Sequence, residues 1–101
     1  MALTREFRET VMEMAKADPE YRRALIDEAV ENFLEGDFET GKHLLRDYLN
    51  ATESFPELAE SVHKDVKSLR RMVGSKGNPR AENLFEIIKF CRAREGMSQA
   101  A

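Results

Sequence analysis

The apolar residues of the chain recur every three or four positions, and short polar segments separate these periodic stretches. This spacing is typical of α-helices that bury one face. No segment alternates apolar and polar residues for long, and β-branched residues are sparse, so no strand is predicted. The pattern predicts an all-α fold, a compact bundle of about six helices joined by short turns.

Residues that favour helix starts and ends divide the chain into the six predicted helices. Pro19 and Pro79 each follow a residue that favours a helix cap, which places proline in the first helical turn. Ser54 and Glu57 match a capping box, in which both side chains cap one helix start. The predicted caps are Thr4, Asp18, Asp37, Ser54, Asp65 and Asn78, and predicted ends include Ala17, Gly36, Val62, Val73 and Arg94.

Each of the first three helices carries one apolar face, which is expected to pack into the core. These faces comprise Phe7, Val11 and Met14, then Tyr21, Leu25, Ala29 (or Val30) and Phe33, then Leu44, Leu45, Tyr48 and Leu49.

The last helix carries two apolar stripes. One stripe follows the helical repeat and is expected to face the core. Ile87 and Phe90 lie off that stripe, near Arg94, and we interpret these three residues as the seam of a homodimer. The alternative is that Ile87 and Phe90 belong to a shallow core. The core stripe comprises Ala81, Leu84, Phe85, Ile88 and Cys91.

Length and composition indicate one soluble globular domain. The chain has 101 residues, of which 42% are hydrophobic and 35% charged. No apolar run approaches the roughly 20 residues of a membrane span, and charges near the N-terminus replace the apolar stretch of a secretory signal. A cytoplasmic protein without a membrane partner is therefore expected. Cys91 is the only cysteine and is expected to be buried, so no intramolecular disulfide forms. His43 is expected on a helix surface and His63 in a turn, so no metal site or cofactor is predicted.

Charge is distributed unevenly along the chain, although the net charge is only −3. Residues 1–61 hold seven Lys and Arg against 15 Asp and Glu, whereas residues 62–94 hold nine against three. The simplest interpretation is two solvated faces. The alternative is two surfaces for two partners, because a basic surface suits phosphates and an acidic one suits a basic protein.

The fourth and fifth helices are short and lie close together in the sequence, as in a helix-turn-helix. Leu69 and Met72 share one face of the fifth helix, which leaves the cations on its other face. That face is typical of a recognition helix in the major groove, where Lys and Arg read base edges and an apolar group contacts thymine. Flanking cations and helix N-termini are expected to contact phosphates. The predicted DNA-binding residues are Ser54, Val66, Lys67, Arg70, Arg71, Lys76, Asn78 and Arg80.

Residues 54–90 resemble the helix-turn-helix of phage-repressor-like regulators of the XRE or Cro/CI type. The similarity is carried by the pairs Leu58-Ala59 and Ser68-Leu69, by the turn at residues 77–79, and by the apolar positions of the helix after it. The family usually has glycine in the turn where this chain has His63, a residue that adopts positive φ less readily than glycine. The resemblance implies a dimer that binds an inverted-repeat operator in double-stranded DNA.

A longer similarity covers about residues 2–92 and includes the stretch GKHLLRDYLNAT. In this range the chain resembles the HigA-like addiction-module antidotes, the antitoxins of type II toxin–antitoxin pairs. The resemblance implies an antitoxin that neutralises a RelE/HigB-like toxin and represses its own operon. Such toxins are basic because they hold RNA, so the acidic helices are the predicted toxin site. The residues assigned to it are Glu6, Glu9, Glu13, Glu28, Glu31 and Glu35.

The expected organisation is a single domain with an acidic helical pair over residues 1–36. A DNA-binding core follows over residues 37–94, with a frayed tail over residues 95–101. No Gly-rich phosphate loop and no hydrolase or metalloprotease motif occurs, so no enzymatic activity is predicted. Two alternatives to the antitoxin stay open. The chain could be a solitary repressor without a toxin, or a helical protein-interaction adaptor without specific DNA binding.

Overall fold

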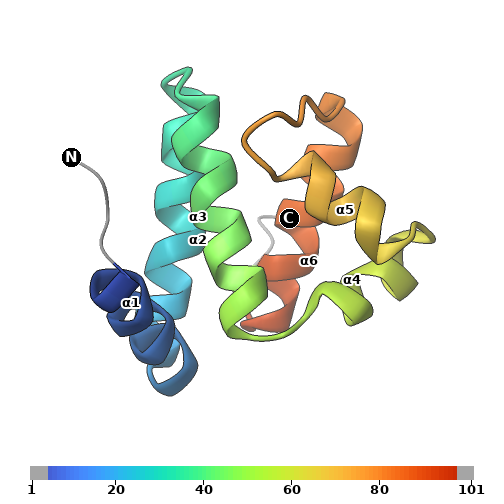
Figure 1. Ribbon diagram of the computed structural model, residues 1–101. Coiled ribbons are helices and arrows are strands. Elements are labelled where there is room, and N and C mark those ends of the chain that lie inside the picture. Colours follow the sequence, from blue (N-terminus) through green and yellow to red (C-terminus); the bar gives the residue numbers. More distant parts are fainter. Residues whose placement is uncertain (1–4, 98–101) are drawn as a thin grey trace.

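Six helices account for the regular structure of residues 5–97, the part of the chain that the computed structural model describes. Figure 1 shows them as α1 (Arg5–Ala17), α2 (Pro19–Leu34), α3 (Phe38–Ala51), α4 (Phe55–Val62), α5 (Val66–Met72) and α6 (Ala81–Arg94). No strand occurs in this range, which confirms the predicted all-α class. The Cα radius of gyration is 12.9 Å, as expected for a compact chain of this length. The predicted cap Thr4 lies outside the described residues.

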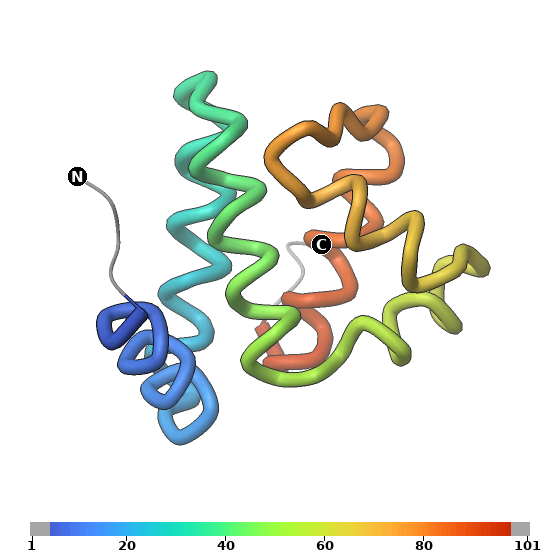
Figure 2. The backbone as a smooth tube through the Cα atoms, viewed as in Figure 1, coloured from blue at the N-terminus to red at the C-terminus, as the bar shows by residue number. Residues whose placement is uncertain are grey.

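The helices α2 and α3 form a long antiparallel pair through the middle of the molecule (Figure 2). Helix α1 lies across one end of this pair and contacts both helices. On the opposite side α6 packs against α2, and α4 packs against α5 and α6. The short helices α4 and α5 therefore lie on the side of the molecule away from α1.

One hydrophobic core joins all six helices. Ala15 of α1 is fully buried, whereas Phe7 and Met14 are 53% and 45% exposed. The predicted apolar face of α1 is therefore partly wrong, because the small Ala15 allows the helix to approach α2 and α3 closely. In α2, Ile26 is fully buried although it was not assigned to the core face. The fully buried residues also include Ala29, Leu45, Tyr48, Leu49, Leu58, Val73 and Cys91.

Helix α6 buries Leu84, Ile88 and Cys91 of the predicted core stripe, but the edge of the buried face differs from the prediction. Ile87 is 1% exposed and belongs to the core, whereas Phe85 is 67% exposed. The reason is that α2 and α4 both contact α6, which moves the buried face toward Ile87. Phe90 is partly buried against the core, and Arg94 is paired with carboxylates of its own chain. Ile87 therefore cannot take part in the predicted dimer seam, whereas Phe90 stays partly exposed and Arg94 exposed.

Three of the predicted helix caps are confirmed. Asp18 accepts a hydrogen bond from the backbone N–H of Glu20, and Asp37 accepts one from that of Thr40. Asp65 caps α5 by accepting from the N–H of Ser68 at 2.6 Å. Hydrogen bonds from Thr40 and Ser68, respectively, lower the pKa of Asp37 and of Asp65.

Of the other two caps in the described range, Ser54 takes the predicted N-cap position of α4 without a capping hydrogen bond, and Asn78 is wrong. Ser54 precedes α4, but its side chain makes no capping hydrogen bond and pairs instead with the hydroxyl of Thr52 at 2.7 Å. Glu57 does not complete a capping box, because the backbone N–H of Ser54 bonds to the backbone oxygen of Leu49, and the Glu57 carboxylate lies 3.7 Å from Arg94 of α6. Asn78 lies in the loop before α6, whose N-cap position is Arg80.

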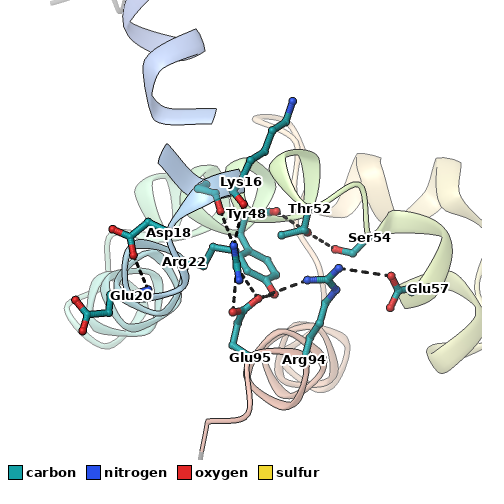
Figure 3. Close-up of polar contacts among 11 residues, drawn as sticks. Lys16, Asp18, Glu20, Arg22, Tyr48, Thr52, Ser54, Glu57, Arg94 and Glu95 are labelled. Carbon is teal, nitrogen blue, oxygen red and sulfur yellow. Dashed lines mark hydrogen bonds and ion pairs between the residues drawn. The ribbon is translucent and has the colours of Figure 1, made fainter. Parts of the chain in front are cut away.

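A buried polar cluster holds the end of α6 against the N-terminal helices (Figure 3). The side chain of Glu95 is 4% exposed and accepts hydrogen bonds from the Tyr48 hydroxyl at 2.6 Å and the Arg22 guanidinium at 3.0 Å. Arg22 also donates to the backbone oxygens of Ala15 and Lys16 at the end of α1. Burial, followed by the hydrogen bond to Glu95, raises the pKa of Tyr48. This cluster connects α1, α2, α3 and α6.

Cys91 is fully buried, as predicted, and burial raises the pKa of its thiol to about 12. Within residues 5–97, no helix has the length and apolar character needed to span a bilayer.

Candidate nucleic-acid interface

The turn between α4 and α5 is built on a left-handed residue. His63 ends α4 with φ 58° and ψ 43°, and its N–H bonds to the backbone oxygen of Ala59. This conformation confirms that His63 is a turn residue, and histidine adopts it at a modest cost. Asp65 then starts α5 directly. Leu58 and Leu69 are buried, so the two short helices share the core and turn their other faces outward.

The outward face of α5 carries three exposed cations, Lys67, Arg70 and Arg71. Val66 is only partly exposed and packs against the core, so its predicted role as an exposed apolar contact is limited. Ser54 has no exposed surface. Its backbone N–H, the predicted phosphate donor, bonds to the backbone oxygen of Leu49, so Ser54 is not available for the predicted phosphate contact.

Arg70 does not extend freely from α5. Its guanidinium carbon lies 4.3 Å from the centroid of the Phe55 ring, and it donates a hydrogen bond to the side-chain oxygen of Asn50 at 3.1 Å. A cation over an aromatic face is attracted by the ring quadrupole. These contacts hold Arg70 against the junction of α3 and α4, an arrangement that the sequence analysis missed.

Three further cations, Arg71, Lys76 and Arg80, surround a shallow polar depression between α5, the loop after it and the start of α6. Arg71, Lys76, Asn78 and Arg80 all line it, so the structure brings together four of the predicted DNA-binding residues. Their cationic members are exposed. Two further polar residues, Ser68 and Asn83, were missed, although their helical spacing from Arg71 and Arg80 could have indicated them. The full lining is Ser68, Arg71, Met72, Lys76, Gly77, Asn78, Pro79, Arg80 and Asn83.

Two basic side chains of α3 hold the loop that carries Lys76. The ammonium of Lys42 donates to the backbone oxygen of Gly77, and the guanidinium of Arg46 donates to that of Val73 at 2.7 Å. Lys42 is only 4% exposed, and its ammonium contacts the loop and the Glu39 carboxylate, which lies 3.0 Å away. The spacing of four residues places Lys42 and Arg46 on one helix face, but only the tertiary contact reveals their role.

His43 is more enclosed than predicted. Its side chain is 27% exposed, with one ring nitrogen 2.7 Å from the Arg46 guanidinium and the other 3.3 Å from the Asp47 carboxylate. The expectation of an exposed surface residue is therefore wrong. The ring instead supports Arg46, which anchors the loop.

The acidic residues assigned to a protein partner are all exposed on α1 and α2. Three of them share one surface of α1, namely Glu6, Glu9 and Glu13. The other three are Glu28 and Glu31 on α2 and Glu35, the C-cap residue of α2. Their carboxylates form no ion pair with the cations of residues 5–97. They are therefore available for contact with another molecule.

No protein-family model matches the chain, and no solved structure is similar to it. Within residues 5–97, no group of three or more His, Cys, Asp or Glu residues is arranged to hold a metal ion.

Proposed function

We propose that α4 and α5 form a phage-repressor-like helix-turn-helix and that α5 binds in the major groove of double-stranded DNA. The single observation that carries this proposal is the gathering of exposed cations on α5 and on the loop that follows. Arg71, Lys76 and Arg80 surround one depression, and Lys67 lies on the same short helix. Exposed cations in this arrangement attract the phosphate backbone and orient the protein on it.

The contacts of each cation suggest which part of the DNA it binds. Lys67 is exposed on the first turn of α5 and has the reach to touch base edges. Arg70 is held over Phe55, so it offers a pre-positioned guanidinium rather than a flexible one. Lys76 and Arg80 lie on the loop and at the start of α6, where they suit phosphate contacts.

Regulation of transcription follows from this proposal, and the resemblance to HigA-like antidotes suggests the antitoxin of a type II pair. In that role the protein represses its own operon and neutralises a basic, RNA-cleaving toxin of the RelE/HigB type. The exposed carboxylates of α1 and α2 support the second activity, because they complement a positively charged partner.

The experiment that tests DNA binding is fluorescence anisotropy with a duplex from upstream of the protein's own gene. A scrambled duplex of the same composition serves as the reference, and each is titrated at two salt concentrations. We expect tighter binding to the upstream duplex and a steep loss of affinity with salt, with a log–log slope of about −0.9 per phosphate neutralised. Equal, weak binding to both duplexes would instead favour the adaptor alternative.

Replacing Lys76 with alanine is expected to weaken binding to both duplexes by a similar factor. The reason is that a phosphate contact carries no sequence information. The magnitude of the log–log salt slope should fall by about 0.9, which corresponds to one contact. Lys89→Ala is the matched control, because Lys89 is also exposed but does not line the depression. An unchanged slope in Lys76→Ala, or an equal loss in the control, would contradict the assignment.

Charge reversal on α1 tests the toxin site. We expect the triple variant Glu6→Lys, Glu9→Lys and Glu13→Lys to lose protection when it is co-expressed with the proposed RelE/HigB-like toxin, because like charges then repel. The measurement is growth of the host after toxin induction. Deleting the acidic helices is a poorer test, because Leu25 and Ile26 of α2 lie in the core.

A second triple variant controls for the change in net charge. Glu53, Glu60 and Glu86 are also exposed but lie outside α1 and α2, so their replacement by lysine should preserve protection. Full protection by the α1 variant would place the toxin site elsewhere.

A further inference from the structure

An apolar groove separates the turn between α2 and α3 from the start of α6. Three large apolar side chains line it and are strongly exposed, namely Leu34 at 82%, Phe38 at 56% and Phe85 at 67%. Exposed residues of this size rarely cluster on a monomer without a partner. The remaining apolar wall consists of Val30, Phe33, Pro79, Ala81, Leu84 and Ile88.

The groove is held open by fixed packing. The Phe33 ring lies across Gly41, where an added Cβ would approach the ring to 2.6 Å, so glycine is required for this contact. The rings of Phe33 and Phe38 have centroids 6.0 Å apart, and Lys42 connects the same wall to Gly77 of the loop. The groove is therefore present before any partner arrives.

We propose that this groove is the homodimer interface and that the same groove of a second copy covers it. The inference deepens the proposed function, because a short recognition helix needs two copies on two half-sites for useful affinity. The groove also replaces the dimer seam predicted around Ile87, because Ile87 is buried in the core. The groove is a different face of α6, and it is the face that carries Phe85.

The apolar area is of the size that a dimer requires. Leu34, Phe38 and Phe85 together expose on the order of 400 Å² per copy, at roughly 200 Å² for a fully exposed large side chain. A stable interface buries about 800 Å² per partner, of which about 500 Å² is apolar. The three side chains therefore supply most of the apolar area, and the groove wall supplies the rest.

The charges beside the groove suit a two-fold axis that runs along it. On the side of the α2–α3 turn, the exposed charges are Glu35 and Glu39. On the opposite side they are Lys76 and Arg80, which precede Glu82, the first carboxylate of α6. A two-fold rotation about the groove places the turn of each copy beside the loop of the other. Opposite charges at the rim then fix the orientation more than they add affinity.

The groove is also continuous with the proposed DNA-binding surface. Gly77, Asn78 and Pro79 line both the apolar groove and the polar depression. The proposed dimer interface and the proposed DNA-binding surface therefore share this loop.

Sedimentation velocity of the full chain without DNA tests the inference, and leaving out DNA separates its outcome from that of the proposed function. We expect a dimer at about 100 μM protein and a mostly monomeric protein after Phe85→Glu, with the dimer dissociation constant raised by more than about tenfold. Because Phe85 is largely exposed, the variant should keep its helical circular dichroism spectrum. Phe7→Glu is the matched control, because Phe7 is exposed at 53% on α1 and does not line the groove.

A wild-type monomer at this concentration would overturn the inference and leave the groove to a different protein. A dimer that persists in both Phe85→Glu and Leu34→Glu would also overturn it, because the interface would lie elsewhere. Dimerisation that is lost in these two variants and kept in Phe7→Glu would support it, whether or not the protein binds DNA.

Discussion

Replacing Gly77 with alanine is expected to lower the free energy of unfolding by about 3 kcal/mol and to weaken DNA binding. The added Cβ would overlap the backbone oxygen of Arg71 and lie 2.5 Å from that of Met72. Both obstacles are backbone atoms at the end of α5, so no side chain can rotate away. The loop must move, and its movement breaks the hydrogen bond from Lys42 to the Gly77 oxygen.

The same displacement should reach the proposed phosphate contacts. Lys76 precedes Gly77 directly, and Arg80 follows it within the loop. If both cations lose their positions, the magnitude of the log–log salt slope falls by about 1.8, or 0.9 for each phosphate. Urea unfolding followed by circular dichroism measures the stability, and anisotropy at two salt concentrations measures the slope.

Gly74→Ala provides a control in the same loop. There the added Cβ would lie 3.2 Å from the backbone oxygen of Arg70 and 3.3 Å from that of Arg71. These distances are tight but can be relieved by a small shift, so the expected loss is below about 1 kcal/mol. Equal stability of the two variants would show that the Gly77 segment does not pack against the end of α5 as described.

Replacing Glu95 with alanine is expected to cost about 3 kcal/mol of unfolding free energy, because the change removes the carboxylate from three partners, Tyr48, Arg22 and Arg94. The Tyr48 side chain is fully buried and would lose the acceptor of its hydroxyl. The Arg22 side chain is 19% exposed and would keep its charge without the carboxylate. Partial exposure of Arg22 limits the loss, since water can solvate part of the guanidinium.

Two variants divide the effect of Glu95 between its partners. Tyr48→Phe removes only the hydroxyl and should cost about 1 kcal/mol, because the ion pair between Arg22 and Glu95 remains. Glu95→Gln keeps a hydrogen-bond acceptor without the charge, so its loss of unfolding free energy should lie between those of Glu95→Ala and Tyr48→Phe. The measurement is the urea midpoint at constant slope. A loss in Tyr48→Phe as large as that in Glu95→Ala would mean that the ion pair contributes little.

Local chemistry explains why much of the helical pattern could be predicted. Asp18, Asp37 and Asp65 cap helices through hydrogen bonds to residues two or three positions away, so the sequence contains both partners. His63 takes the turn position because α4 ends there and its N–H bonds back to Ala59. The six helices and their approximate bounds follow from such short-range contacts.

The candidate interface was predicted only in part. Exposed cations on α5 follow from the burial of Leu69 on its other face, which helical spacing indicates. The positions of these cations depend on residues far away in the chain. Arg70 bonds to Asn50, and the loop is held by Lys42 and Arg46 of α3. No local pattern specifies which helix meets that loop.

The sequence by itself determined the helical class, most helix starts and the separation of acidic from basic segments. Only the tertiary structure decided whether Phe85 or Ile87 joins the buried stripe of α6, because both fit helical spacing and the contacts with α2 and α4 select between them. The same packing buries Ser54 and leaves Phe85 at an open groove. Periodicity defines which residues share a helix face, but neighbouring helices define which face is covered.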